Sequence, residues 1–269
     1  MNKSQPSMRS TIQQIALAVV FLTLGFLLRA LVKMLFDVEI SKWVASLLNF
    51  ALAAFGAFVV FPRWLKQPFG QVDLGEYCRR LGFYLPPGAW KHIALGIVLA
   101  LCTLSGMLVG SLLGGRYVLD WRTVNLPHIL FSLNAGVWEE FFYRGIIMMI
   151  LLNRTRSVKT AVLIQVLLFG LMHVKGFDLW SWVDVLSVTI ITLGFVYAAY
   201  KTRALLAGIV FHFVHDALLF LVQSPESESV GLLEHVQFYL ALWVMVGVAC
   251  LLIKVAADKL GVQAQTELY

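Results

Sequence analysis

Two adjacent glutamates, Glu139 and Glu140, lie within an apolar stretch that runs from Ile129 to Leu152. Placing one charged side chain at the centre of a bilayer costs about 2.5–3.5 kcal/mol on insertion scales. Arg144 follows Glu140 by four residues, so that both side chains share one helix face and can pair. Because of this cost, ionisable residues within an apolar segment indicate a functional site.

Polar residues also interrupt two later apolar segments. His173 closes a run that contains Phe169 four residues earlier, and His212 precedes Asp216 by the same interval. Each four-residue step places both members on one helix face. Phe169 is expected to pack, whereas histidine exchanges a proton near neutral pH. Carboxylates and imidazoles on three separate segments therefore indicate acid–base chemistry.

The chemistry that such a set can perform is hydrolysis by an activated water. A desolvated carboxylate holds its proton more tightly and so works better as a general base near neutral pH. Glu140 is expected to pair with Arg144, whereas Glu139 points about 100° away around the helix and has no local partner. We therefore predict Glu139 as the reactive group, with one histidine sharing its water and a second donating to the oxyanion. Peptide-bond hydrolysis by this route needs no serine or cysteine nucleophile.

Each of these residues also has a structural interpretation. The pair formed by Glu140 and Arg144 could serve only to hold helices together, and His212 could simply form a hydrogen bond with Asp216 inside one helix. A further histidine, His215, is expected to fill space or line the rim of the site. The coincidence of polar residues on three segments favours a catalytic site over these interpretations.

The composition identifies an integral membrane protein. Hydrophobic residues make up 60% of the 269 residues, charged residues only 13%, and the mean hydropathy is +0.82. Soluble domains contain about a quarter charged residues. The net charge of +6 is typical of basic cytoplasmic loops, so we predict a lipid bilayer and no nucleic acid as partner. The three cysteines have no metal-ligand spacing and predict no disulfide.

Apolar runs of about 20 residues predict an all-α, polytopic transmembrane helical bundle with about eight spans, in a single integral membrane domain over residues 1–269. The first span is the weakest, because Arg29 and Lys33 interrupt its end. The middle of the long connection 62–90 is expected to be a basic loop or to lie along the membrane surface. The predicted spans are 12–34, 43–61, 91–113, 128–152, 158–176, 183–200, 204–222 and 236–256.

Lysine and arginine set the orientation of the spans. Alternate connections, starting with the N-terminus, carry 14 of these residues, and the opposite set carries six. Because cytoplasmic loops are enriched in basic residues, both termini are predicted to be cytoplasmic.

The polar motifs resemble those of the family of CAAX proteases and bacteriocin-processing enzymes, which are intramembrane glutamate proteases and include the type II CAAX prenyl endopeptidases. The family motif Glu-Glu-x-x-x-Arg matches Glu139, Glu140 and Arg144. Its motif Phe-x-x-x-His matches Phe169 and His173, and its motif His-x-x-x-Asn or Asp matches His212 and Asp216. The motifs occur in the family's order and define a predicted catalytic core over residues 128–217.

The resemblance implies a polar cavity that opens toward the cytosol. It implies that Glu139 and His173 activate water, and that His212 and residue 216 form the oxyanion site. Prenyl-protein proteases of the family carry asparagine where this chain has Asp216, and an ionised aspartate cannot donate a hydrogen bond. Asp216 is therefore either protonated or orients His212.

We predict a membrane-embedded endopeptidase of the bacterial plasma membrane. Its partner would be a membrane-associated peptide or protein substrate, and the sequence leaves open whether that substrate is lipidated.

The nearest alternative is a zinc-dependent intramembrane metalloprotease, because these side chains also bind zinc. Its ligands would be Glu139, His173 and His212. The chain lacks the His-Glu-x-x-His sequence of many zinc proteases, and we therefore predict a mechanism without a cofactor.

Alternatives of other classes are a proton-coupled transporter and a non-catalytic immunity or scaffold protein. Transporters have polar groups along a path and helices broken by glycine or proline near mid-membrane. Here the charges cluster in one band, and no proline occurs between residues 128 and 222. This clustering favours an enzyme, while Asp216 keeps the non-catalytic alternative open.

Overall fold

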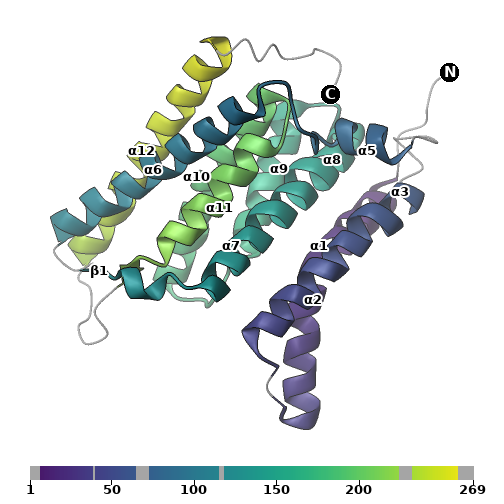
Figure 1. Ribbon diagram of the computed structural model, residues 1–269, viewed down its shortest axis with the longest axis horizontal. Helices are drawn as coiled ribbons and strands as arrows, with labels where there is room; N and C mark the ends of the chain where they lie inside the picture. Colours follow the sequence, from purple (N-terminus) through teal and green to yellow (C-terminus); the bar gives the residue numbers. More distant parts are fainter. Residues whose placement is uncertain (1–6, 39, 65–72, 115–117, 224–231, 260–269) are drawn as a thin grey trace.

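The computed structural model is a bundle of helices (Figure 1) and describes residues 7–38, 40–64, 73–114, 118–223 and 232–259. The long helices are α1 (Met8–Phe36), α2 (Lys42–Phe55), α6 (Ala89–Gly114), α10 (Leu179–Thr202) and α12 (Leu232–Lys259). The shorter ones are α3 (Phe61–Trp64), α5 (Leu74–Arg80), α7 (Leu126–Glu139), α8 (Met148–Thr155), α9 (Val158–Leu171) and α11 (Leu206–Leu219). Two segments are π-helical, η1 (Gly56–Val60) and η3 (Glu140–Ile147), and η2 (Trp121–Thr123) is a 3₁₀ turn. A two-residue antiparallel pairing joins β1 (Val118–Leu119) to β2 (Val222–Gln223).

The all-α, polytopic character predicted from the sequence is confirmed. Within the described ranges, five helices are long and apolar enough to cross a membrane, and they coincide with the first, second, third, sixth and eighth predicted spans. The fourth span is a continuous helical stretch of α7, η3 and α8, which contains Glu139, Glu140 and Arg144. The fifth and seventh are the shorter apolar helices α9 and α11. The total of eight crossings stays a prediction.

The first span was wrongly expected to be the weakest. It forms one unbroken helix of 29 residues, α1, and meets the length and composition of a membrane span. Arg29 lies within this helix, and its Nε donates to the carbonyl of Ile40 at 2.9 Å, beyond the end of the helix. A guanidinium that bonds the neighbouring connection is compatible with a helix that continues past it.

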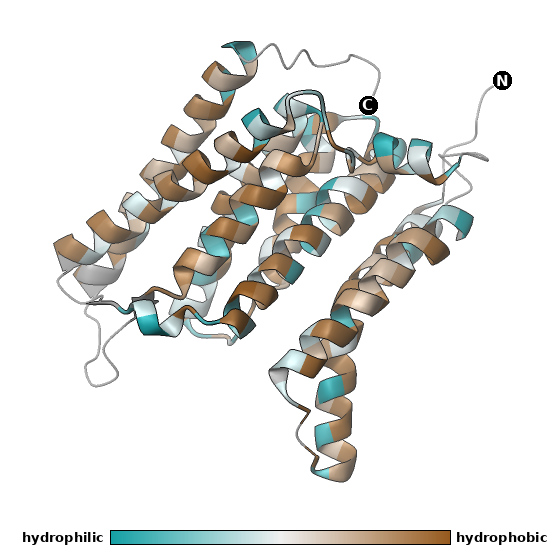
Figure 2. Ribbon diagram, in the orientation of Figure 1, coloured by the Kyte–Doolittle hydropathy of each residue, from teal (hydrophilic) through white to brown (hydrophobic). Residues whose placement is uncertain are grey.

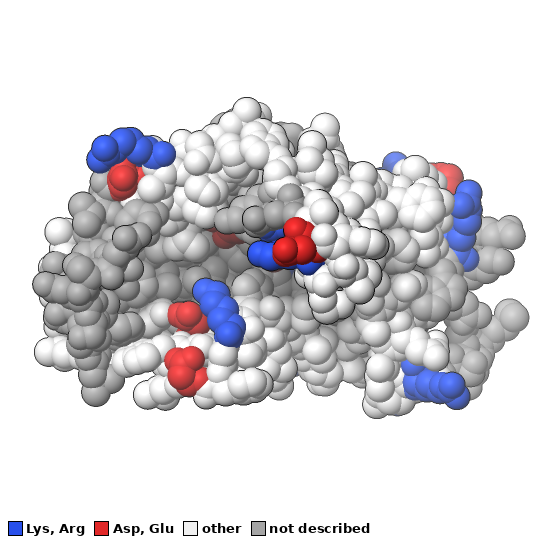
Figure 3. All heavy atoms as spheres, turned by 90° about the horizontal axis from the view of Figure 1, so that it is seen from below, with Lys and Arg blue, Asp and Glu red and all other residues white. Residues whose placement is uncertain are grey.

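The helices pack in a chain of neighbours. α6 lies against α11 and α12, α11 against α7, and α10 against α9 and α12, while α1 and α2 form a hairpin. The hairpin contacts α7 through α2, and Figure 1 shows it diverging from α7 toward the end that carries β1. Hydrophobic residues cover much of the lengths of the helices, and many of the hydrophilic ones gather near their ends (Figure 2). At the end that carries β1, charged side chains occur in a few separate groups (Figure 3).

The connection between α3 and α6 contains a short helix, α5, that docks on the bundle over its described part, and its position along a membrane surface stays a prediction. α5 begins after Asp73, whose side chain accepts from the backbone N–H of Glu76. Tyr77 is buried, and its hydroxyl donates to the carbonyl of Ala57 at 3.0 Å. The carbonyl of Gly82 then accepts from the N–H of Leu205 at 2.8 Å. Burial of an aromatic side chain and these hydrogen bonds dock the segment on the bundle. Residues 65–72 of the predicted connection lie outside the described residues.

The orientation of the bundle can be tested with single cysteines. The natural cysteines Cys78, Cys102 and Cys250 would be replaced by serine. A cysteine at exposed Thr160, beside the basic connection before α9, should react with a membrane-impermeant maleimide only after the membrane is opened. A cysteine at exposed Phe177, after α9, should react in intact cells. The reverse pattern would place the termini outside.

Candidate active site

The two glutamates lie where the helix changes from α to π. Glu139 is the last residue of α7, and Glu140 is the first of η3, whose eight residues are all buried. Short π-helical segments within α-helices are frequent at functional sites. The side chain of Glu139 is 24% exposed, whereas that of Glu140 is 0% exposed. The pair is thus divided into one carboxylate that reaches a cavity and one that is sealed in the protein.

Glu140 forms the ion pair with Arg144 that the four-residue spacing suggested. Arg144 Nε lies 3.3 Å from Glu140 Oε2, and the Arg144 side chain is only 1% exposed. The guanidinium carbon lies 4.4 Å from the centre of the Phe169 ring and 5.3 Å from that of Phe195. Arginine over aromatic faces gains a cation–π attraction that is greatest where water is excluded. Phe169 therefore holds the cation as well as filling space.

Glu140 has a second partner that spacing did not indicate. Its Oε1 lies 2.8 Å from Nδ1 of His212, on α11. Since a carboxylate accepts, the ring donates from Nδ1 and its orientation is fixed. Two glycines allow this approach. A Cβ on Gly136 would lie 2.8 Å from Phe213 Cβ, and one on Gly208 would lie 3.1 Å from Glu140 Oε2. One carboxylate therefore joins η3 to α11.

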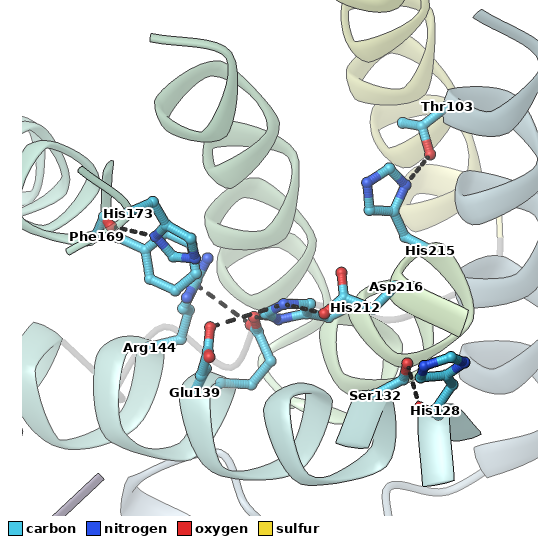
Figure 4. A network of polar contacts seen from close by, with 11 residues as sticks. Thr103, His128, Ser132, Glu139, Arg144, Phe169, His173, His212, His215 and Asp216 are labelled. Carbon is cyan, nitrogen blue, oxygen red and sulfur yellow. Dashed lines mark hydrogen bonds and ion pairs between the residues drawn. The ribbon is translucent and has the colours of Figure 1, made fainter. Parts of the chain in front are cut away.

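The other ring nitrogen of His212 lies between two carboxylates. Nε2 is 3.8 Å from Oε2 of Glu139 and 3.5 Å from Oδ2 of Asp216. Figure 4 shows these side chains converging from α7 and α11. The ring also stacks on Phe195, with centroids 4.5 Å apart and planes at 14°. Since Glu140 fixes Nδ1 and Phe195 fixes the plane, Nε2 can carry a proton directed at this pair of acids.

His173 is held in one tautomer by the backbone. Its Nδ1 lies 2.8 Å from the carbonyl oxygen of Phe169, one turn earlier. A carbonyl only accepts, so Nδ1 carries the hydrogen and Nε2 of the neutral ring has a free lone pair. The ring also contacts Phe169, with centroids 4.9 Å apart. His173 is therefore arranged as a proton acceptor at Nε2.

Glu139 and His173 share the wall of a small cavity of about 130 Å³. A larger apolar cleft of about 550 Å³ lies beside it, between the α1–α2 hairpin and the first half of α7. Phe26, Phe131 and Asn134 line both spaces. His212 and Asp216 are not among the residues that line the small cavity. An apolar segment in the cleft would therefore lie next to Glu139.

The cleft lies at the end of the bundle that is remote from the basic connections. Its walls come from the second half of α1, the start of α2 and the start of α7. Toward the opposite end, Phe58, Phe83, Trp138 and Phe141 contact one another edge to face or tilted. The resemblance implies a cavity open to the cytosol. With the orientation predicted from basic residues, the cleft instead faces the outer side.

In the described part of the chain, no three or more His, Cys, Asp and Glu side chains are close enough together to hold a metal ion such as zinc. Nδ1 of His212 meets Glu140 and Nδ1 of His173 meets the carbonyl of Phe169. Metal-binding histidines make the same kind of contact through the nitrogen that faces away from the metal, so the absence of a cofactor stays a prediction.

His215 lies apart from this group. It is buried, and its Nδ1 lies 3.0 Å from the hydroxyl of Thr103 on α6, on the far side of α11 from Glu139 (Figure 4). This agrees with the expectation that His215 fills space. Sequence reasoning did not single out Phe195 or Asn134, because neither belongs to a charged motif. The only signal for Asn134 was an amide within an apolar stretch.

Comparison with known proteins agrees with this geometry. Residues 121–218 match the model of the family described as type II CAAX prenyl endopeptidase Rce1-like. The matched segment contains all three motifs and extends from η2 to α11. No curated protein and no solved structure matches the chain. The resemblance seen in the motifs is therefore confirmed over this segment, and it supports a membrane-embedded hydrolase.

The two glutamates should differ in what they do for stability. Glu140→Gln leaves Arg144 buried without its counter-ion, and breaking such a pair costs about 3–5 kcal/mol. Glu139→Gln removes a partly exposed carboxylate whose contact with Nε2 of His212 is longer, 3.8 Å, and should change stability by less than about 1 kcal/mol. Thermal unfolding of the full chain in detergent would measure both. Equal melting temperatures for the two variants would contradict this division of roles.

Proposed function

We propose that this protein is an intramembrane endopeptidase that hydrolyses a peptide bond of a membrane-associated substrate, with Glu139 and His173 activating the water. The observation that carries the proposal is their shared position on one cavity wall, with Nε2 of His173 free to accept a hydrogen bond. The match to a protease family supports the class of reaction. We further propose that the protein acts in a bacterial plasma membrane, without a cofactor.

The reaction begins with a water molecule held between Glu139 and Nε2 of His173. The Glu139 carboxylate takes one proton while the water oxygen attacks the peptide carbonyl carbon, forming a tetrahedral intermediate with a negative oxygen. The C–N bond then breaks as the protonated Glu139 returns the proton to the leaving amine. Glu139 thus acts as base and then as acid, and each atom of the water ends in a product.

In this scheme His212 and Asp216 do not contact the substrate and instead orient Glu139 and balance its charge. His212 is oriented by Glu140 through Nδ1 and presents Nε2 to Glu139 and Asp216. The group contains three carboxylates and one permanent cation, Arg144. A proton on Nε2 of His212 offsets part of this excess of negative charge, and Asp216, as an acceptor, keeps that proton directed into the group. We therefore favour the orienting role of Asp216 over a donor role.

The apolar cleft supports a membrane-associated substrate. Its lining is dominated by aromatic and aliphatic side chains, and it meets the small cavity at Phe26, Phe131 and Asn134. A lipidated or otherwise apolar segment in the cleft would place an adjoining peptide bond near Glu139. Prenylated proteins that end in a CAAX sequence are the substrate class suggested by the family description.

Glu139→Gln should abolish cleavage without loss of the fold, because glutamine cannot take the proton of the water. Quantitative mass spectrometry would compare membrane-protein peptides from cells that contain the wild type and cells that contain the variant. We expect cleaved termini that occur only with the wild type. Full cleavage by Glu139→Gln would refute the assignment.

The metal-free mechanism predicts that a chelator leaves cleavage unchanged. The full chain, purified in detergent, would be analysed for zinc by mass spectrometry and assayed before and after treatment with EDTA and 1,10-phenanthroline. We expect less than one zinc in ten protein molecules and activity within about twofold. Stoichiometric zinc together with loss of activity, restored by adding zinc, would establish the metalloprotease instead.

A further inference from the structure

The wall of the cavity beside Glu139 contains a buried amide with no assigned role. Asn134, on α7, is 5% exposed, and its Oδ1 is buried without a hydrogen-bond partner among the described residues. A buried polar atom that is left unpaired costs about 1–3 kcal/mol. Other buried polar atoms of the described residues are also unpaired, so what distinguishes Asn134 is its position. Asn134 is also the one polar side chain that lines both the cavity and the cleft within the described residues.

Hydrolysis by an activated water needs a donor that the assigned residues do not provide. The negative oxygen of the tetrahedral intermediate is stabilised by N–H or O–H groups aimed at it from a dry site. Asp216 accepts and cannot donate when ionised. His212 has Nδ1 bound to Glu140 and Nε2 directed at two carboxylates, and neither residue lines the cavity. The two residues that the resemblance assigns to the oxyanion site, His212 and Asp216, therefore contact Glu139 from outside the small cavity in this chain.

A second asparagine on the same wall has a structural task. Asn49 Oδ1 accepts from the backbone N–H of Gly25 at 3.1 Å and so ties α2 to α1. Asn134 has no comparable bond within the described part of the chain. The terminal torsion of asparagine is broad, so its NH₂ group can turn to the cavity without moving the helix. Glu139 is five residues further along the same helical stretch, and its side chain lines the same small cavity as that of Asn134.

We propose that the side-chain amide of Asn134 donates the hydrogen bond that stabilises the oxyanion during peptide hydrolysis. Asn134 lines both the apolar cleft and the small cavity that contains Glu139, so its NH₂ group can turn toward a peptide that extends from the cleft to Glu139. It takes the place of the asparagine that prenyl-protein proteases of the family carry where this chain has Asp216. This assignment rests on the proposed function. Asn134 would touch the reacting carbonyl oxygen and would act on the transition state more than on the bound substrate.

The test compares Asn134→Leu and Asn134→Asp with the wild type, as the full chain in detergent. Leucine keeps the number of side-chain heavy atoms and removes the donor, and aspartate keeps the shape and replaces the donor with an acceptor. The probe is a fluorescence-quenched peptide that ends in a farnesylated Cys-Val-Ile-Met sequence. Loss of one oxyanion donor lowers kcat by about 100- to 1000-fold, and we expect this loss with KM changed by less than about threefold.

A structural role predicts different results. Because the amide oxygen has no partner, Asn134→Leu should leave the melting temperature unchanged or raise it. The matched control is Ser132→Ala on the same helix, where the hydroxyl donates to the carbonyl of His128 at 2.9 Å and is not part of the cavity wall. This control should cleave the probe like the wild type.

Binding is measured separately from cleavage, as the melting-temperature shift caused by the aldehyde analogue of the same farnesylated peptide. Ligands that bind only the folded state raise its stability. The hydrated aldehyde mimics the tetrahedral intermediate, so the rise in melting temperature that it causes should be smaller in Asn134→Leu than in the wild type. Binding of the intact peptide is measured in proteins that also carry Glu139→Gln and do not cleave it. There, Asn134→Leu should leave the rise in melting temperature unchanged. Undiminished kcat in both Asn134 variants would overturn the inference alone. A wild type that neither cleaves the peptide nor is stabilised by the aldehyde would overturn the prenylated substrate class, whereas the mass-spectrometric comparison with Glu139→Gln tests the proposed function itself.

Discussion

The arrangement of the site depends on one buried carboxylate, Glu140. Its two oxygens contact Arg144 in the next turn and His212 on another helix. In the dry interior an isolated carboxylate would be strongly destabilising, and the ion pair with Arg144 together with the hydrogen bond from His212 offsets part of that cost. Because Glu140 fixes the ring of His212, the nitrogen that faces Glu139 has a defined direction. The neighbouring glutamate is thereby left free for chemistry.

Close helix packing makes this contact possible. Gly136 and Gly208 remove side chains from the places where α11 meets α7 and Glu140. The π-helical segment starts at Glu140, so the two glutamates belong to different helix geometries. Aromatic rings then surround Arg144 and His212 and exclude water. Exclusion of water strengthens each electrostatic interaction in the group, which is why a small number of polar residues can organise three helices.

Much of the fold was predictable because the membrane restricts it. Apolar runs gave helices near the predicted positions, since a chain in lipid must satisfy its backbone hydrogen bonds within each segment. The prediction was less accurate for α1. Arg29 was expected to interrupt this span, whereas its side chain bonds the connection that follows the helix. The docked α5 was also missed. Its anchoring depends on contacts of Tyr77 and Gly82 with residues far away in the chain, and these leave no periodic pattern.

By itself, the sequence determined the membrane class, the three polar motifs and the pairing of Glu140 with Arg144, because these follow from composition and from the spacing of residues along one helix. The tertiary structure decided which residues meet across helices. It joined His212 to Glu140, placed Glu139 and His173 on one cavity wall, and set the buried amide of Asn134 between that cavity and the apolar cleft. Distances between helices depend on packing of the whole bundle, and no local spacing records them.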